Sequence, residues 1–509
     1  METNQIKKGI ILSYASLAIS AVFGLIQVPI YTKLMGESEY GIYGAMGSIL
    51  ASFSVMDFGL SATIVRFYSR YKALKDSKNM ENILAICSIL YSILSVLALL
   101  IGGIVYLNFN NWLGKNLSIE QIFEAKQIYI VILINIAFTI PSQLFTAILN
   151  AHERFSFLKL LNIFQTVAQF LTVIAVLIHH PTALTLVIII TFFNLIIIPI
   201  KIYYCFVKLK VKIKLHSVPE GLLSSILSFT FLIFLTTIVD QLLWRANPII
   251  LLQLKGPEES AIYTVAFTIF TNYMLLSTVI SSVFLPKVTH MVTMGISNTS
   301  LSNLFIKVGR IQFLLLSCVL TGFILFGMQF IDIFTSKKSE QFSYSSAYYI
   351  TLLLIVPFTI DLIQNIGLTI LQAKNKILFR TCVFLSMAIV NVFVAYQLAK
   401  FWGGIGCAFA TGLVFLIGNL VFMNIYYAKH IYIDIKEFWK QIGKISFISL
   451  ICYVIGLFIN SISLFPNLIN FALKIVLYVL VYFSIMWALA MNDYEKGLIK
   501  GLLRKITIH

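Results

Sequence analysis

Long apolar runs separated by short polar stretches occupy almost the whole chain of 509 residues, and this pattern constrains the fold most strongly. A helix that crosses a lipid bilayer needs about 20 predominantly apolar residues. The chain contains fourteen runs of about this length, with connections too short to hold a soluble domain. They cover residues 10–32, 40–65, 82–107, 127–150, 160–178, 183–205, 222–252, 260–286, 309–333, 345–372, 379–399, 404–427, 445–462 and 467–491. The sequence therefore predicts an all-α polytopic membrane protein with about fourteen transmembrane helices.

The residue composition excludes several other classes of protein. Charged residues make up only 11% of the chain, whereas a soluble domain carries about 25%, so a soluble multidomain enzyme is excluded. The hydrophobic content of 59% is too high for a disordered chain. The six cysteines form no CxxC pair and the seven histidines form no HExxH motif. We therefore expect neither a metal site nor a disulfide framework.

The net charge of +17 comes from an uneven distribution of lysine and arginine along the chain. If the N-terminus is cytoplasmic, the loops and ends on the cytoplasmic side hold 28 of these residues and the opposite side holds 8. Lysine and arginine stay preferentially on the cytoplasmic side of membrane proteins. We therefore expect both termini in the cytoplasm. The positive charge is then an orientation signal, and no nucleic-acid partner is expected.

Two halves of the chain resemble each other at a nearly constant offset. Three short segments of the first half recur in the second, namely 34–43 as 254–263, 148–151 as 370–373, and 202–204 as 425–427. The offsets are 220, 222 and 223 residues, and Phe157 matches Phe379 within the same register. This distance equals six predicted spans. Because six is even, both copies enter the membrane from the same side, which predicts parallel repeats related by an axis along the membrane normal.

The repeat predicts two pseudo-symmetric six-helix lobes followed by two further helices. The N-terminal lobe is expected at residues 1–205, a basic cytoplasmic linker at 206–221, and the C-terminal lobe at 222–427. Helices 13 and 14 and a cytoplasmic tail are expected at 428–509. Two such lobes can rock about a central cleft in alternating access. The alternative is an old duplication without a transport role.

Several motifs resemble those of a known transporter family. They are Tyr31-Thr32-Lys33-Leu34-Met35-Gly36-Glu37-Ser38-Glu39-Tyr40-Gly41-Ile42-Tyr43, Met56-Asp57-Phe58-Gly59-Leu60-Ser61 followed by Arg66, Asp240-Gln241-Leu242-Leu243-Trp244-Arg245, and Val283-Phe284-Leu285-Pro286-Lys287-Val288. Together with the fourteen-span plan, they resemble the polysaccharide flippases, which move lipid-linked oligosaccharides. These belong to the superfamily of multidrug, oligosaccharidyl-lipid and polysaccharide exporters.

The resemblance implies a multi-pass protein of the bacterial inner membrane that is not an enzyme. It would move undecaprenyl-diphosphate-linked oligosaccharide repeat units from the cytoplasmic to the outer leaflet by alternating access. These units serve the synthesis of a surface polysaccharide such as O-antigen, capsule or exopolysaccharide. The implied partners are this polyprenyl-diphosphate-linked substrate, membrane lipids, and polysaccharide polymerase and chain-length machinery. No cofactor is expected, apart from H⁺ or Na⁺ as a coupling ion.

Two other functions compete with this one. A small-molecule or multidrug antiporter of the same superfamily, coupled to a cation, would use an acidic cleft. Three aspartates and one arginine within the spans are compatible with it. A polysaccharide polymerase or ligase would need a catalytic surface on large external loops. The external loops are short and hold no His/Arg/Glu constellation, which disfavours an enzyme.

Four charged residues, Asp57, Asp240, Arg245 and Asp361, fall clearly inside predicted spans, away from their ends. A charge at the bilayer centre is a functional candidate because its insertion costs about 2.5–3.5 kcal/mol. Arg245 either faces the cleft and binds an anionic diphosphate or acidic sugar, or it forms a structural pair with Asp57 or Asp361. Asp57, Asp240 and Asp361 are candidates for ion coupling or lobe gating. Their alternative role is interhelical hydrogen bonding.

The other candidates for substrate binding lie at the cytoplasmic rim or at equivalent positions of the two lobes. Arg66 could engage the diphosphate, or its side chain could snorkel to lipid headgroups. Lys287 and Arg310 could attract an anionic substrate at the inner mouth, or act as positive-inside anchors. Gln143 and Asn365 occupy equivalent positions in spans 4 and 10, which suits a polar cleft lining.

Overall fold

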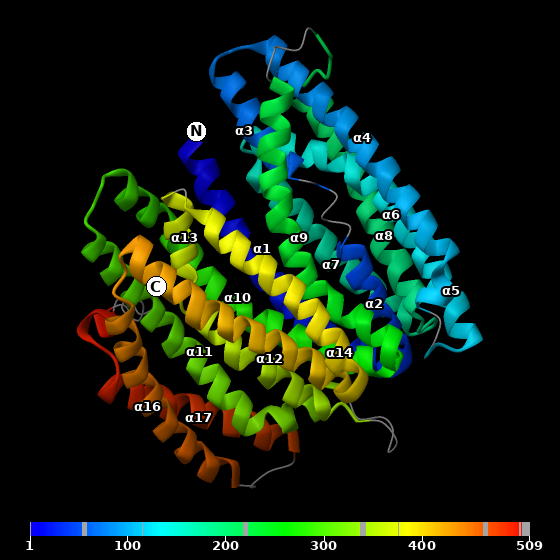
Figure 1. Ribbon diagram of the computed structural model, residues 1–509. Helices are drawn as coiled ribbons and strands as arrows, with labels where there is room; N and C mark the ends of the chain where they lie inside the picture. The colour runs from blue at the N-terminus through cyan, green and yellow to red at the C-terminus, as the bar shows by residue number, and fades with distance from the viewer. Residues whose placement is uncertain are drawn as a thin grey trace. The chain divides into compact units, whose positions relative to one another are not determined.

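A computed structural model describes residues 2–52, 57, 59–113, 116–216, 222–335, 343–374, 376–461, 467–497 and 500. Every regular element in these ranges is a helix (Figure 1). The helices are α1 (Glu2–Met35), α2 (Glu37–Ser52), α3 (Leu60–Ala73), α4 (Ser77–Leu107), α5 (Phe109–Trp112), α6 (Ile119–Ala151), α7 (Phe155–Leu177), α8 (Ala183–Tyr203), α9 (Leu222–Lys255), α10 (Pro257–Thr293), α11 (Asn298–Thr335), α12 (Ser346–Leu362), α13 (Asn365–Ala373), α14 (Ile377–Ile417), α15 (Asn424–Tyr426), α16 (Ile435–Ser461) and α17 (Asn467–Leu489), with π-helical segments at Tyr204–Lys208, Gly418–Met423 and Tyr427–Ile431.

The all-α membrane architecture expected from the apolar runs is confirmed. Ten helical segments of the described chain are long and apolar enough to cross a bilayer, or eleven if the pair α12 and α13, bent by 41°, is one span. The count of about fourteen spans is not confirmed. The predicted run 40–65 is divided into α2 and α3, and Gly59 begins α3 with a φ of 77°. At 1.5 Å per residue α2 is about 24 Å long, which is short for a bilayer core of about 30 Å.

The predicted runs 379–399 and 404–427 meet at a break of the helix. The element α14 begins in the first run and ends within the second, and it is interrupted at Gly403, where the backbone is not helical and φ is 55°. A Cβ atom at Gly403 would lie 2.5 Å from Oε1 of Glu259. Glycine is therefore required there both by the backbone conformation and by the available space.

Some of the predicted segments extend beyond the part that the structure describes. Residues 53–56 and 58 of the run 40–65, residues 217–221 of the linker and residues 501–509 of the tail lie outside the described residues. The chain divides into two compact units. The first contains residues 1–264 and 392–404, and the second contains 265–391 and 405–509.

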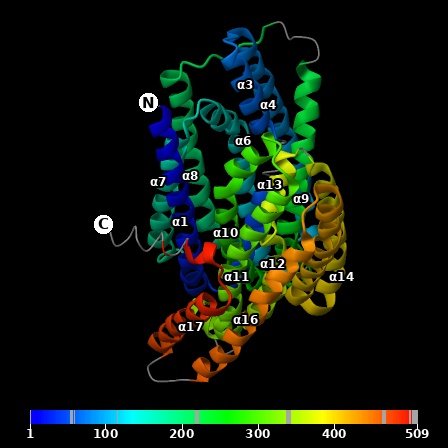
Figure 2. The same ribbon diagram turned by 90° about the vertical axis from the view of Figure 1, so that its left-hand side faces the viewer.

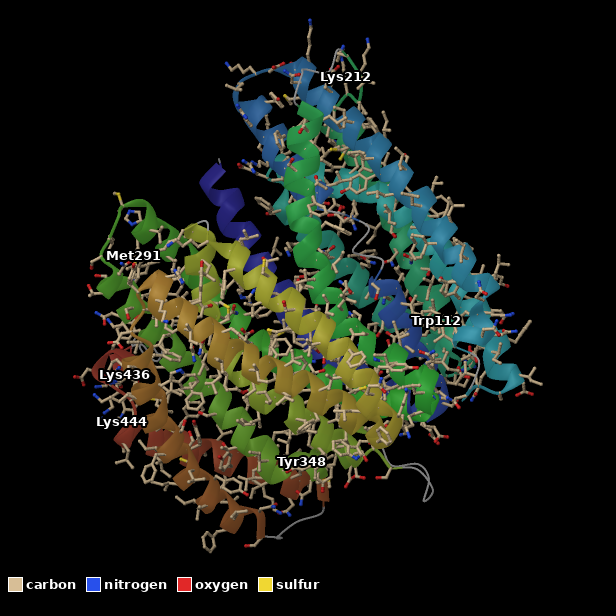
Figure 3. All side chains as sticks on the ribbon, viewed as in Figure 1. Trp112, Lys212, Met291, Tyr348, Lys436 and Lys444 are labelled. Carbon is tan, nitrogen blue, oxygen red and sulfur yellow. The ribbon has the colours of Figure 1, made fainter. Side chains whose placement is uncertain are left out.

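In the first unit, α6 packs against both α4 and α8, and α1 lies along α7 (Figures 1 and 2). Large side chains such as Tyr91 and Tyr129 are completely or almost completely buried in it. Figure 3 shows Lys212 and Trp112 at opposite ends of this unit. The predicted cytoplasmic linker and the predicted outer loop therefore lie at opposite ends of the same helices.

In the second unit, α11 packs against α16 and α17, and their contact is apolar. Leu325, Phe326, Cys452 and Tyr478 are buried members of this core. The appended helices α16 and α17 are thus part of a packed core. Figure 3 shows Lys436 and Lys444 projecting from the first half of α16, away from Tyr348 in α12.

The two copies of the internal repeat share their local geometry at the first corner. Gly36 joins α1 to α2 with a φ of 82°, and Gly256 joins α9 to α10 with a φ of 94°. Both glycines adopt the left-handed conformation that other L-residues avoid. In the first copy the amide of Tyr40 donates to the carbonyl of Gly36. In the second copy the amide of Ser260 donates to the carbonyl of Gly256, again four residues earlier.

A second corner is repeated in the same way. The amide of Arg154 donates to the carbonyl of Leu149 at 2.9 Å, and the amide of Lys376 donates to the carbonyl of Leu371 at 2.8 Å. Donor and acceptor of the second bond each lie 222 residues after those of the first. The helices that follow are held to their lobes by an aromatic stack. Phe157 stacks on Tyr204 and Phe379 stacks on Tyr426, both with ring centroids 4.1 Å apart. The two copies therefore share backbone corners and the contacts that hold them.

Candidate functional site

A polar groove of about 320 Å³ lies between α1 and α7 in the first unit. Side chains from α1 form one wall and side chains from α7 form the other. Those of α1 are Ser16, Ser20, Phe23, Gln27 and Tyr31, and those of α7 are Asn162, Gln165, Thr166, Gln169 and Phe170. Seven of the ten carry an amide or an aliphatic hydroxyl group, and none carries a formal charge at neutral pH. The groove is thus rich in hydrogen-bonding groups and has no ionic group in its lining.

The helical repeat explains why these residues line one groove. The lining positions of α1 follow one another at steps of four, three, four and four residues, which places them on a single helix face. The lining residues of α7 also lie on one helix face, because each turn contributes residues three or four positions after those of the turn before. From Ser16 to Tyr31 the lining extends about 22 Å along α1 at 1.5 Å per residue. It therefore covers most of the depth of a bilayer core, which is about 30 Å.

Only part of the polar lining is used inside the protein. The amide of Gln165 donates to Oδ1 of Asn194 in α8 at 2.7 Å, and the hydroxyl of Thr166 donates to the carbonyl of Asn162 at 2.8 Å. Within the described part of the chain, the side chains of Ser20, Gln27 and Gln169 have no hydrogen-bond partner in the protein. Their donors and acceptors are available to water or to a ligand.

Two aromatic rings face each other across the groove. Phe23 of α1 and Phe170 of α7 stack with centroids 4.5 Å apart and planes at 8°. This stacking is an apolar contact between α1 and α7 within an otherwise polar lining. Few residues of α1 and α7 are buried against the rest of the protein. Polar groups at this depth need a partner, because an unpaired polar group in an apolar environment costs about 1–3 kcal/mol.

The sequence prediction missed this groove because it weighed charged residues within spans. The signal was nevertheless present in the sequence. A helical stripe of Ser16, Ser20 and Gln27 within one apolar run, and another of Gln165 and Gln169 in a second, are unusual in hydrocarbon.

Arg245 lies on α9 in the same unit, and its side chain is half-buried. Its guanidinium group lies near the side chain of Tyr43. The ring of Tyr43 meets the ring of Tyr31 edge to face, with centroids 6.2 Å apart. Because Tyr31 lines the groove, Tyr43 and Tyr31 together connect Arg245 with one end of the groove.

Asp240 lies five residues before Arg245 on α9, and its side chain is exposed.

Asp57 lies where the chain breaks between α2 and α3. Its Oδ1 accepts hydrogen bonds from Tyr91 at 2.5 Å and from Ser61 at 2.8 Å. Tyr91 is completely buried on α4. These contacts favour a structural role for Asp57, because they attach the segment between α2 and α3 to α4.

Two other candidates lie on neighbouring helices. Arg66 is exposed on α3, with its guanidinium group 5.7 Å from the centroid of the Phe67 ring. Gln143 is partly buried on α6.

Asp361 of α12 pairs with a residue that the sequence prediction did not single out. Its Oδ1 lies 3.8 Å from a guanidinium nitrogen of Arg380 in α14, and Arg380 also lies 4.0 Å from the centroid of the Phe384 ring. Both members belong to the second unit. Asn365 begins α13 just after the bend and is partly buried. The pairing partner was missed because 19 residues and a helix end separate it from Asp361.

Arg310 is buried, and its hydrogen bonds hold the segment that follows α17. It donates through Nε at 2.7 Å and Nη2 at 2.9 Å to the carboxylate of Glu495, and also to Gln441 and to the carbonyl of Ala490. These contacts favour a structural role in the protein interior, which differs both from substrate binding and from positive-inside anchoring at the membrane surface. Lys287 of α10, in contrast, is exposed.

Two carboxyl groups that the sequence prediction did not single out meet at the start of α8. Glu39 accepts a hydrogen bond from the amide of Ala183 at 2.6 Å, and Glu124 accepts one from Leu184 at 3.2 Å. The two carboxyl groups also bond to each other. Burial, reinforced by the bond to Glu124, raises the pKa of Glu39 to about 7. The pair therefore takes up a proton near neutral pH.

Comparisons with known proteins agree with this architecture. A family described as "Polysaccharide biosynthesis protein" matches residues 6–292, which is more than half of the chain. No curated protein sequence matches the chain significantly.

Among solved structures, a lipid II flippase, MurJ, in an inward closed conformation matches with a TM-score of 0.76 at 17% identity, covering 96% of this chain and all of the other. An inward-facing multidrug resistance MATE family transporter of the MOP superfamily matches with a TM-score of 0.62 at 14% identity, covering 79% of this chain and 96% of the other. An outward-facing MATE transporter of that superfamily matches with a TM-score of 0.56 at 14% identity, covering 82% and 92%. At these identities the likeness concerns the fold.

The family match over residues 6–292, the helical architecture and the repeated corners all support the same assignment. The chain belongs to the polysaccharide biosynthesis protein family, and it is a multi-pass membrane protein with the fold of the lipid II flippase and MATE transporters.

Proposed function

We propose that this protein is a flippase for undecaprenyl-diphosphate-linked oligosaccharide repeat units. It moves them from the cytoplasmic to the outer leaflet of a bacterial inner membrane, with both of its termini in the cytoplasm. The observation that carries the proposal is the combination of a polysaccharide biosynthesis family with a fold that matches a lipid II flippase over 96% of the chain. The flipped units then serve a polymerase and chain-length machinery that build a surface polysaccharide, such as O-antigen, capsule or exopolysaccharide.

The energetic task of such a flippase is to carry a polar headgroup through hydrocarbon. A diphosphate and its sugars need hydrogen bonds and counter-charge throughout the passage, while the polyprenyl tail remains in lipid. Arg245 supplies a positive charge within α9, and the groove between α1 and α7 supplies uncharged hydrogen-bonding groups along much of the membrane depth. Alternating access between the two lobes then exposes the headgroup on the outer side.

The exposed cations Arg66 and Lys287 attract the anionic lipid headgroup before entry, as does the positive charge of the cytoplasmic rim. Gln143 and Asn365 contribute polar groups to the path. Asp240 and Asp361 bind or release the coupling ion, H⁺ or Na⁺. No further cofactor takes part, and no chemical bond is formed or broken in the cycle.

The test is deletion of the gene in its host, followed by complementation. Without the protein, unpolymerised lipid-linked repeat units accumulate on the inner leaflet and surface polysaccharide is lost. The wild-type gene restores export, and the Arg245→Ala variant restores it poorly at equal protein level. Normal surface polysaccharide in the deletion strain, with no accumulation of repeat units, would contradict the proposal.

A cation-coupled exporter of small molecules is the alternative function, and the pair of Asp361 with Arg380 favours it. A carboxylate held by one arginine at 3.8 Å can exchange that partner for a proton or Na⁺ during a cycle. A drug-efflux assay in a sensitised strain separates the two functions. Efflux that is lost in the Asp361→Asn variant, with polysaccharide export intact, would establish the antiporter.

A further inference from the structure

We propose that the groove between α1 and α7 is the binding site for the uncharged sugar residues of the lipid-linked substrate. This inference rests on the proposed flippase function and names the part of the substrate that the groove takes. The observations that carry it are the chemistry of the lining and its connection to Arg245.

The chemistry of the lining matches that of a carbohydrate. Each sugar hydroxyl is both a donor and an acceptor, and so are the hydroxyl groups of Ser16, Ser20 and Thr166, while amides such as Gln27 and Gln169 offer both functions side by side. The edges of the stacked Phe23 and Phe170 rings offer apolar contact for the C–H groups of a sugar ring. An anionic ligand would instead require arginine or lysine in the lining, and none is present there.

The groove also has a suitable size and position. Its volume of about 320 Å³ lies at the lower end of the range of about 300–1,000 Å³ that is typical of small-molecule sites. It therefore accepts a short stretch of sugars and not a whole long glycan. Tyr31 and Tyr43 join one end of the groove to Arg245. A diphosphate held by Arg245 thus places the sugars attached to it at the groove.

The second repeat lacks part of the polar lining of α7. At the offset of 222, Asn162, Gln165 and Thr166 of α7 correspond to Phe384, Met387 and Ala388 of α14, which are all buried. The backbone corner and the aromatic stack that begin both helices are the same. A duplicated helix can therefore pack with apolar residues at these positions. Asn162, Gln165 and Thr166 are therefore not needed to pack a helix at this place, whereas Gln169 corresponds to Asn391, which is polar and buried.

The test measures binding of two lipids to the purified protein by native mass spectrometry. One probe is the pool of lipid-linked oligosaccharides extracted from the host's own membranes, and the other is undecaprenyl diphosphate without sugar. The wild-type protein is expected to bind the first more tightly than the second. In the double variant Gln27→Leu, Gln169→Leu this preference falls roughly tenfold, because each lost hydrogen bond weakens binding severalfold. Affinity for bare undecaprenyl diphosphate stays unchanged.

A matched pair of variants on α7 controls for packing. Thr166→Val removes a hydroxyl inside the groove, and Thr172→Val makes the same change outside the lining. Thr166→Val is expected to lower the preference for the oligosaccharide, and Thr172→Val to leave it unchanged. Thermal unfolding of each variant verifies the fold.

The possible results separate the two proposals. If the wild-type protein prefers the oligosaccharide and the groove variants keep that preference, the groove is not the sugar site and the flippase function stands. If the wild-type protein binds neither lipid, the flippase function fails, and the sugar site fails with it.

Discussion

The two repeats of this protein share their corners and differ in their polar chemistry. Gly36 and Gly256 turn the chain in the same way, and Phe157–Tyr204 and Phe379–Tyr426 form equal stacks. The first repeat, however, places uncharged polar residues in a groove between α1 and α7. The second repeat carries apolar residues at three of the corresponding positions of α14, Phe384, Met387 and Ala388, and keeps a polar residue, Asn391, at a fourth. Two of its arginines, Arg310 and Arg380, form ion pairs.

This difference separates what the fold needs from what the function needs. Glycine at a corner and an aromatic stack beside it recur because both lobes must make the same turn. Polar side chains on a membrane helix recur only where they have partners, because without partners they destabilise the protein. Residues that differ between the two copies at equivalent positions are therefore the better guide to function in this protein.

The largest expected effect concerns the buried ion pair of the second unit. Arg310→Met leaves the carboxylate of Glu495 buried without its partner, so the free energy of unfolding should fall by about 3–5 kcal/mol. The double variant Arg310→Met, Glu495→Leu should recover most of this loss. Thermal and denaturant unfolding in detergent measures both. Equal stability of the single variant and the wild type would remove the pair from the structural account.

The next effect concerns export and tests the groove by comparison with the second repeat. Asn162→Phe with Thr166→Ala gives α7 the residues found at 384 and 388 of α14. We expect surface polysaccharide to fall about tenfold, because hydrogen bonds to the substrate are lost. The protein level and thermal stability should be retained. Unchanged export with a folded protein would mean that the polar lining has no role in transport.

A smaller effect tests whether the corners are equivalent. Alanine at Gly36 or at Gly256 must adopt a positive φ, which costs about 1–2 kcal/mol for an L-residue. A Cβ atom at Gly36 meets nothing within 4 Å, and at Gly256 it approaches Asn116 only to 3.4 Å. The loss of stability should thus come from the backbone and be nearly equal in the two variants. A large loss at one corner alone would show that the repeats differ there.

A further effect is a pH dependence in the first unit. The pKa of Glu39 is raised from its ordinary value of 4.5 to about 7, so the folded state keeps a proton that the unfolded chain releases. Stability should therefore decrease as the pH rises from about 4.5 to about 7, and then level off. Thermal unfolding between these values measures the slope. Glu39→Gln should flatten it, and an equal slope in this variant would assign the dependence to another group.

The sequence predicted the membrane class, the repeat and most of the helices, because apolar runs and recurring motifs record these features directly. It did not predict the break at Gly59, since the run 40–65 is apolar on both sides of it. The pairing of Asp361 with Arg380 and of Arg310 with Glu495 depends on tertiary contacts between distant residues. The groove corresponds to a helical stripe of residues from Ser16 to Tyr31, which a search for charged residues within spans does not find.

The most direct test of the central claim is lipid transfer across a defined membrane. Purified protein is reconstituted into vesicles that contain lipid-linked oligosaccharides from the host, and a membrane-impermeant lectin reports the headgroups in the outer leaflet. The flippase account predicts that the inner-leaflet pool becomes accessible in vesicles with the wild-type protein, and much more slowly with the Asn162→Phe, Thr166→Ala variant. The same accessible fraction in vesicles with folded wild-type protein and in empty vesicles would contradict the account.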